Sequence, residues 1–267
     1  MCINQSNGKN NIVLYADIGN STIDFLLVNG NSFSVEKVRT RSKDDIFDYI
    51  GKMNVLEEVY VSSVNSSGLQ SLKEALADKF PHCRIGFIDR ETMKEYASSH
   101  KIKVDNIDIL GSDLFCDIVA EENKTGMIVI DLGTASKILY LDKDSCFKGC
   151  QIFPGLSSFS EILHAKTDLL KDSPIIIDPP LVSLKTEECI SSGVINGVSS
   201  LISGMVKAIK TEYDNKDTKV ILTGGNSYLI KDTLKAWMKD DFIYDVYNTL
   251  KGLVRISGHD IAFLKGE

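Results

Sequence analysis

The sequence predicts an α/β protein of two duplicated lobes, with a mixed sheet in each lobe and a ligand cleft between them. Strand-like and helical segments alternate along the chain, which is typical of this class. A pattern of apolar strand, aspartate, glycine, small hydroxyl residues and second apolar strand occurs twice, at 15–28 and at 127–141. At 267 residues the chain is long enough for two compact lobes, which we place at residues 1–124 and 125–267.

The first lobe is predicted to alternate between strands and helices. Apolar and β-branched runs predict strands at 12–16, 23–28, 33–38, 59–64 and 83–89. Helical spacing of apolar residues predicts helices at 42–53, where a polar N-cap precedes the helix, at 69–79 and at 113–122. The last of these is amphipathic, and we expect its apolar side to face a core.

The second lobe begins by repeating the opening pattern of the first. Asp131 stands where Asp17 stands in the first copy, and Gly133 stands where Gly19 does. Helices are predicted near 157–170 and over 187–212, with a proline-bearing loop at 178–180 between them, and the strand at 219–227 ends in a double glycine. The small and apolar residues of the long helix suit either a core or a subunit face.

Composition and charge restrict the class of partner. The net charge of −7 argues against a nucleic-acid partner, because a surface that binds nucleic acid normally has a basic excess. We expect no membrane partner, since no apolar run approaches the roughly 20 residues that span a bilayer. The N-terminus lacks the apolar core of a signal peptide, and the six scattered cysteines are expected to be free, buried thiols. The expected location is the cytoplasm.

Three glycine-bearing turns follow apolar strands, at 17–21, 131–135 and 223–226. Glycine allows a backbone to approach a phosphate closely, and loops at the carboxyl ends of strands are where ligands bind in open α/β sheets. An aspartate beside a phosphate requires a cation such as magnesium between them. Each turn alone could be an ordinary β-hairpin. The three together resemble the loops of the actin and hexokinase (ribonuclease H-like) superfamily of phosphotransferases.

Seven segments, in order, resemble the type III pantothenate kinases, which phosphorylate pantothenate with ATP at the first step of coenzyme A synthesis. The resemblance covers nearly the whole chain. The segments are "DIGNSTID" (17–24), "LGSDLFCDIVA" (110–120), "DLGTAS" (131–136), "GCQIFPGL" (149–156), "LHAKTDLL" (163–170), "TEECISSG" (186–193) and "LTGGN" (222–226).

The resemblance implies a role for each matching position. Asp17 would organise Mg²⁺ for ATP, Asp113 would be the catalytic carboxylate facing the substrate hydroxyl, and Asp131 would bind a monovalent cation, K⁺ or NH₄⁺. The family is dimeric, so a homodimer is implied, with pantothenate bound partly against the second subunit. The implied ATP-binding residues are Asp17, Ile18, Gly19, Asn20, Ser21, Thr22, Ile23, Asp24 and Thr134, and the implied substrate-binding residues are Val104, Gly111, Ser112, Asp113, Leu114 and Thr186.

The chain departs from the family pattern at the substrate segment. Leu114 replaces an arginine that contacts substrate, and Val104 replaces a tyrosine that lines the pantothenate pocket. The planar guanidinium of an arginine can donate two hydrogen bonds to a carboxylate, and pantothenate carries a carboxylate. Two alternatives to a pantothenate kinase therefore stay open: a catalytically weak or inactive paralogue that acts as a nucleotide-binding or regulatory protein, and a kinase of another small hydroxylated substrate.

Three of the implied site residues also have purely structural interpretations. Asp113 and Thr186 are residue types that favour the N-cap of a helix, and each stands where a helix is predicted to begin. Asp131 could belong to an ordinary hairpin turn.

Overall fold

The computed structural model describes residues 12–30, 32–170, 174–239, 241–260 and 264. Its first sheet has five strands in the order β3-β2-β1-β4-β5. β1 pairs antiparallel with β2 and parallel with β4, so the sheet is mixed. The strands are β1 (Ile12–Ile18), β2 (Thr22–Asn29), β3 (Ser32–Arg39), β4 (Glu58–Ser63) and β5 (Arg84–Phe87).

The second sheet repeats the topology of the first. Its order is β10-β9-β6-β7-β8, and β6 pairs antiparallel with β7 and parallel with β9. The duplicated, mixed-sheet α/β fold predicted from the sequence is therefore confirmed. The strands are β6 (Met127–Leu132), β7 (Ala135–Leu141), β8 (Phe147–Pro154), β9 (Lys219–Thr223) and β10 (Ile243–Tyr244).

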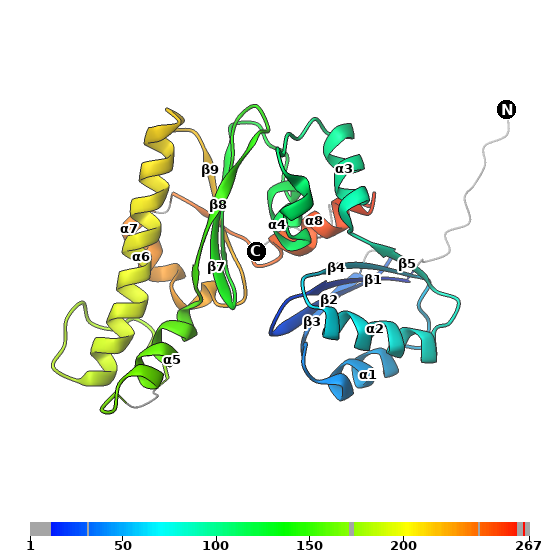
Figure 1. Ribbon diagram of the computed structural model, residues 1–267, viewed down its shortest axis with the longest axis horizontal. Helices are drawn as coiled ribbons and strands as arrows, with labels where there is room; N and C mark the ends of the chain where they lie inside the picture. Colours follow the sequence, from blue (N-terminus) through cyan, green and yellow to red (C-terminus); the bar gives the residue numbers. More distant parts are fainter. Residues whose placement is uncertain (1–11, 31, 171–173, 240, 261–263, 265–267) are drawn as a thin grey trace.

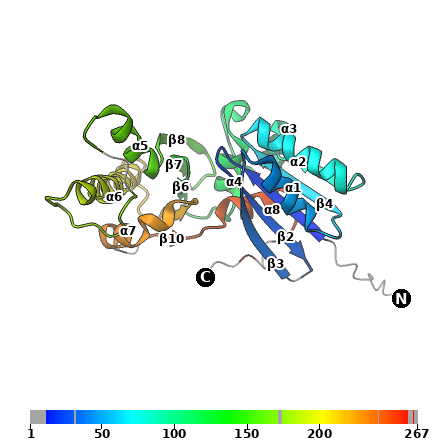
Figure 2. The ribbon, with the colours of Figure 1, turned by 90° about the horizontal axis from the view of Figure 1, so that it is seen from below.

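Helices cover both sheets, and two of them lie between the sheets in both views (Figures 1 and 2). These two are α4 (Ser112–Val119) and α8 (Asn248–Ile256). The outer side of the first sheet carries α1 (Lys43–Gly51) and α2 (Ser66–Lys79), and that of the second carries α6 (Thr186–Glu212). The remaining elements are α3 (Arg90–Ser99), α5 (Leu156–Lys166), α7 (Lys231–Met238) and the short 3₁₀ helices η1 (Ile107–Ile109) and η2 (Ser227–Leu229).

Strand alternation divides the interior into three cores. On β1, Leu14 packs in an outer core with α1 and α2, whereas Tyr15 faces a central core. On β6, Ile128 packs in the other outer core with α6, whereas Val129 faces the same central core as Tyr15. The central core is thus shared by both sheets, and α4 and α8 fill it. Side chains at the ends of β1 and β6 that point to this side face one another.

One α-helix and one strand, along with both short 3₁₀ helices, were not predicted, and some predicted details are wrong. The helix α3 and the strand β8 went unrecognised, because α3 is mostly polar and β8 alternates between exposed and half-buried residues. Ser42 is the N-cap of α1, as expected, and accepts a hydrogen bond from Asp45 N–H at 3.2 Å. Of the described cysteines, which are all free, Cys116 is buried, Cys83 and Cys146 are half-buried, and Cys150 and Cys189 are exposed. Cys2 lies outside the described residues.

The helix α6 bears on the expectation that no segment spans a membrane. By length and composition it is apolar enough to cross a bilayer, but a single such helix is weak evidence of a span. One side of the helix is buried against the second sheet, in the outer core that also contains Ile128 and Ile130. A buried core helix passes the same length and hydropathy test. The buried residues of α6 are Ser191, Ser192, Val194, Ile195, Val198, Ser199, Ile202 and Val206.

Candidate active site

The three glycine loops meet in space. Ser21, which follows β1, and Thr134, which follows β6, form a hydrogen bond between their hydroxyl oxygens at 2.8 Å. Asn226, in the third loop, donates its backbone N–H to the carbonyl of Leu132 at 2.8 Å and its side-chain amide to Gly133 at 3.2 Å. Two loops more than 100 residues apart in the chain are therefore in direct contact, as their duplicated pattern suggested.

The third loop requires glycine for a steric reason. Gly224 has φ of +93°, which disfavours any residue with a Cβ atom. A Cβ there would also collide with the carboxylate of Asp131 and the backbone of Leu132. The glycine therefore allows β9 to end against the second acidic loop.

Five carboxylates approach one another beside these loops. Asp17 and Asp24 are opposite one another on β1 and β2, Asp131 ends β6, and Asp113 lies in the first turn of α4. Asp117, one turn further along α4, is fully buried. These carboxylates repel one another, since Asp113 and Asp131 each raise the pKa of Asp17. Such a cluster requires positive charge to be stable.

Lys137 provides positive charge at the centre of this cluster. It is opposite Asp131 in the β6–β7 register, and its Nζ lies 2.7 Å from Asp131 Oδ2 and 3.0 Å from Asp113 Oδ2. Burial alone would lower the pKa of this ammonium, but Asp131 and Asp113 outweigh burial and raise it above its ordinary value. The lysine is therefore protonated and pairs with two carboxylates at once.

Asp17 has no such partner. Burial, followed by the nearby Asp113 and Asp24, raises the pKa of its carboxyl from 3.8 to about 7, although a hydrogen bond from Ser62 opposes the rise. Among the residues that the structure describes, no lysine or arginine forms an ion pair with it. A buried carboxylate in this situation is a good ligand for a divalent cation, which takes oxygen ligands and compensates the charge. Asp17 is therefore a candidate Mg²⁺ ligand, although no three His, Cys, Asp or Glu side chains of the described residues are grouped so as to hold a metal ion by themselves.

A second lysine reaches this region from the edge of the first sheet. Lys37, on β3, pairs with Asp24 at 3.1 Å. Burial raises the pKa of Asp24, and Lys37 opposes that rise. The Nζ of Lys37 would lie 2.9 Å from a Cβ atom built on Gly225, so the lysine reaches the third loop. It therefore brings positive charge from the first sheet to a loop of the second.

Asp117 joins the two central helices. Its Oδ1 accepts hydrogen bonds from Asn248 Nδ2 at 3.2 Å and from Thr249 Oγ1 at 2.7 Å, both at the start of α8. Complete burial, followed by the charge of Asp131, raises its pKa well above the ordinary value. Asp117 therefore holds α4, the helix that carries Asp113, against α8.

The segment expected to bind substrate is built around Asp113. Ser112 hydrogen-bonds Ser62 through their hydroxyls at 3.0 Å and accepts from Ser63 N–H at 3.2 Å, which fixes the start of α4 to β4. A Cβ atom on Gly111 would come within 2.4 Å of Asp113 Oδ1, so a larger residue there would displace the Asp113 carboxylate. The N-cap of α4 is Gly111, and the structural interpretation of Asp113 as an N-cap is wrong.

The other three predicted substrate residues, Val104, Leu114 and Thr186, have different surroundings. Val104 and Leu114 are partly buried and pack against the central core. Thr186 is exposed and is the first residue of α6, after the N-cap Lys185, so it is not an N-cap either. Because α6 covers the side of the second sheet that faces away from α4, this chain does not bring Thr186 to the Asp113 group (Figures 1 and 2).

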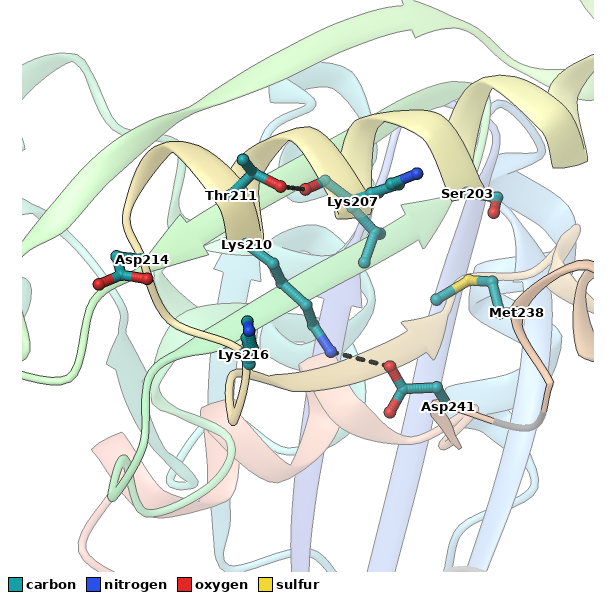
Figure 3. A pocket seen from close by; sticks show the side chains of 9 residues that line it. Ser203, Lys207, Lys210, Thr211, Asp214, Lys216, Met238 and Asp241 are labelled. Carbon is teal, nitrogen blue, oxygen red and sulfur yellow. Dashed lines mark hydrogen bonds and ion pairs between the residues drawn. The ribbon is translucent and has the colours of Figure 1, made fainter.

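A cavity of about 360 Å³ lies elsewhere, between the second half of α6 and the end of α7. Figure 3 shows Lys210 and Asp241 facing each other across it, with an ion pair of 2.8 Å. Lys207 and Lys216 are exposed, and Lys210, whose side chain is 14% exposed, is already paired with Asp241. We assign no role to this cavity.

The duplicated sheet topology and the meeting of two acidic glycine loops define a phosphotransferase fold of the actin and hexokinase type. Within that class, the chain belongs to the type III pantothenate kinase family, whose family model matches residues 13–208.

Individual relatives agree with this assignment. A type III pantothenate kinase from Persephonella marina is 32% identical over 92% of this chain and 98% of its own length. The corresponding enzyme from Acholeplasma laidlawii is 31% identical over the same shares of the two chains. A solved structure from Campylobacter jejuni, assigned to the Baf family of transcriptional activators, has a TM-score of 0.57 at 22% identity, covering 92% of this chain and 97% of that one. This last likeness concerns the fold alone.

Four residues of the site were not predicted from the sequence. Lys137 could have been found, because a tight β6–β7 hairpin places it opposite Asp131. The contributions of Lys37, Ser62 and Asp117 depend on how β3, β4 and α8 pack, and no local pattern marks them.

Proposed function

We propose that this protein is an ATP-dependent kinase that phosphorylates pantothenate to 4′-phosphopantothenate, the first step of coenzyme A synthesis. Membership of the type III pantothenate kinase family supports the substrate. The observation that carries the reaction type is the contact between Ser21 and Thr134, which joins the two acidic loops. Lys137 contacts Asp131 of the second loop and also the Asp113 carboxylate. We also propose that the protein works as a cytoplasmic homodimer without a nucleic-acid or membrane partner, in keeping with the family and the net charge of −7.

The first loop would hold ATP and its metal. The backbone of residues 17–24 turns tightly, with Gly19 N–H donating to the carbonyl of Thr22 at 2.9 Å, and Thr134 would contact the nucleotide from the second loop. The uncompensated carboxylate of Asp17 would hold Mg²⁺. Bound magnesium neutralises the charge that develops on the transferred phosphoryl group.

Asp113 would act on the substrate. The primary hydroxyl oxygen of pantothenate forms the new bond to the γ-phosphorus, the bond to the β,γ-bridging oxygen breaks, and ADP leaves. The hydroxyl proton passes to the carboxylate of Asp113, which lies in the first turn of α4. Most of the rate in such a reaction comes from the positioning of the groups and from charge neutralisation.

The expected monovalent cation does not fit the residues present. Asp131 was expected to hold K⁺ or NH₄⁺, but its carboxylate pairs with the Lys137 ammonium at 2.7 Å. We therefore include no monovalent ion in the reaction.

A kinase of a different small hydroxylated substrate is the second candidate. The packing of Leu114 and Val104 against the central core favours it, because neither side chain can bind the pantothenate carboxylate. A catalytically weak, nucleotide-binding paralogue would share the same fold. A panel of hydroxylated substrates in the ADP-release assay separates these candidates, since a paralogue without activity releases no ADP with any of them.

The test is pantothenate-dependent ADP release, measured with Mg²⁺ and with ATP binding followed in parallel by calorimetry. Asp113→Asn should lower turnover by about 100-fold or more while ATP still binds, because only the proton acceptor is removed. Asp105→Asn is the matched control, since Asp105 is exposed and lies nearby in the chain. Full turnover by Asp113→Asn would refute the assigned role, and ATP binding without any pantothenate-dependent turnover would refute the substrate.

A further inference from the structure

Lys137 is a buried cation held between two carboxylates of the site. The side chains of Lys137 and Asp113 are each 17% exposed and that of Asp131 is 12% exposed. Its Nζ lies 2.7 Å from Asp131 Oδ2 and 3.0 Å from Asp113 Oδ2, and both contacts are hydrogen bonds. A charged group is buried in this way only when its partners compensate for lost hydration.

The geometry of Lys137 is fixed by the sheet rather than by a flexible loop. Lys137 and Asp131 are directly opposite on β7 and β6, so the pair forms as soon as the hairpin does. Asp113 comes from α4, which is anchored to β4 through Ser112 and to α8 through Asp117. The lysine therefore links a fixed strand pair of the second lobe to the helix that carries the proton acceptor.

The charge balance of the cluster also depends on this lysine. Asp113, Asp24 and Asp131 disfavour the ionised form of Asp17, and Asp131 and Asp113 disfavour that of Asp117. Lys137 is attracted by Asp131, Asp113 and Asp117. The other nearby lysine, Lys37, is bound to Asp24. Removing Lys137 would leave Asp113 and Asp131 facing each other without a cation.

We propose that the Lys137 ammonium serves as a built-in monovalent cation, which takes the place of a K⁺ or NH₄⁺ ion at Asp131 and positions Asp113 for the reaction. An ammonium group has the charge of K⁺ and nearly its size. Because the Lys137 ammonium already binds Oδ2 of both Asp131 and Asp113, turnover does not require an added monovalent cation. Lys137 is a positioning residue, since it acts through Asp113. This inference rests on the proposed kinase function.

The first test uses the unmodified protein. Pantothenate-dependent ADP release is measured with Mg²⁺ in chloride salts of K⁺, NH₄⁺, Na⁺ and choline at constant ionic strength. We expect the same rate in every salt. A rate that rises severalfold with K⁺ or NH₄⁺ over choline overturns the proposal, and this comparison requires no variant.

The second test removes the ammonium. Lys137→Ala should lose about 100-fold in kcat in choline chloride, because the carboxylates lose the charge that orients them. K⁺ or NH₄⁺ should restore a substantial part of the loss, and choline should not. The matched control is Lys148→Ala, on the adjacent strand β8, where the lysine pairs with Asp142 at 3.1 Å. It should keep full activity in all salts. A Lys137→Ala enzyme that is fully active and insensitive to the salt refutes the proposal.

A third readout does not depend on turnover. The melting temperature of Lys137→Ala should rise when choline is replaced by K⁺. The same replacement should change the melting temperature of the unmodified protein no more than that of the Lys148→Ala control. If the unmodified protein releases no ADP with pantothenate in any salt, the proposed function fails, and the melting experiment still decides the role of Lys137. A K⁺-dependent rise in the unmodified protein, or none in the variant, overturns the inference.

Discussion

At the scale of single residues, Asp17 is a carboxylate of the cluster that has no lysine or arginine partner among the described residues. Its neighbours Asp113, Asp24 and Asp131 all disfavour the ionised form, and the pKa of about 7 reflects burial together with these charges. Asp131 and Asp24, by contrast, each contact a lysine. The site therefore places an unpaired carboxylate where a metal would bind, at a cost to the stability of the metal-free protein.

Asp17 should make the metal-free protein less stable as the pH rises. The folded state retains a proton up to about pH 7 that the unfolded state loses near 3.8, so the free energy of unfolding falls as the pH rises through this interval. Asp17→Asn removes this dependence and should raise the free energy of unfolding at pH 8 by on the order of 1–3 kcal/mol. The same variant should lose Mg²⁺-dependent ATP binding.

Urea denaturation at pH 5 and pH 8, without divalent metal, measures the effect of Asp17. Asp105→Asn, with an exposed side chain, should leave the pH dependence unchanged. An Asp17→Asn protein that is less stable than the unmodified protein at pH 8 would contradict the prediction.

At the scale of elements, the contact between α4 and α8 holds the catalytic helix in place. α8 is close enough to α4 that a Cβ atom on Gly252 would collide with the backbone of Cys116. At the N-terminal end of α8, the side-chain amide of Asn248 donates hydrogen bonds to both the backbone carbonyl and the carboxylate of Asp117. Since α8 falls within the proposed lobe 125–267 and α4 within 1–124, this contact joins the two parts of the chain.

Gly252→Ala should therefore be strongly destabilising. The added methyl group has no space against the Cys116 backbone, and we expect a loss of about 3 kcal/mol or more in the free energy of unfolding. Gly204→Ala, in the middle of α6 with nothing within 4 Å of the added carbon, should instead gain up to about 1 kcal/mol from helix propensity. Chemical denaturation measures the free energy of unfolding of each variant. Equal values for Gly252→Ala and Gly204→Ala would show that α4 and α8 are not in close contact.

At the scale of the whole molecule, the two lobes meet through their loops. The hydroxyl contact between Ser21 and Thr134 closes the space between the first and second loops. We expect a nucleotide that binds both loops to displace this contact. We infer that the lobes separate at this point when ATP enters, as in a hinge motion between two rigid parts.

A reversible cross-link between the first and second loops should prevent ATP from binding. In the double variant Ser21→Cys/Thr134→Cys, the two side chains occupy positions already in contact, so a disulfide is expected under oxidising conditions. The oxidised protein should not bind Mg²⁺·ATP in calorimetry, and a thiol reductant should restore binding. Each single variant, treated identically, controls for the substitution itself. Undiminished binding by the fully oxidised double variant would place the nucleotide elsewhere.

The sequence by itself determined the duplicated fold, both acidic loops and the position of Asp113, because these depend on local patterns: strand periodicity, glycine turns and the start of a helix. Only the tertiary structure decided that Thr186 lies away from Asp113, that Leu114 packs against the central core, and that Lys137 pairs with Asp131, the residue expected to bind a monovalent cation. The physical reason is that these outcomes depend on strand register and on how the two sheets pack around α4 and α8. No stretch of neighbouring residues encodes that packing.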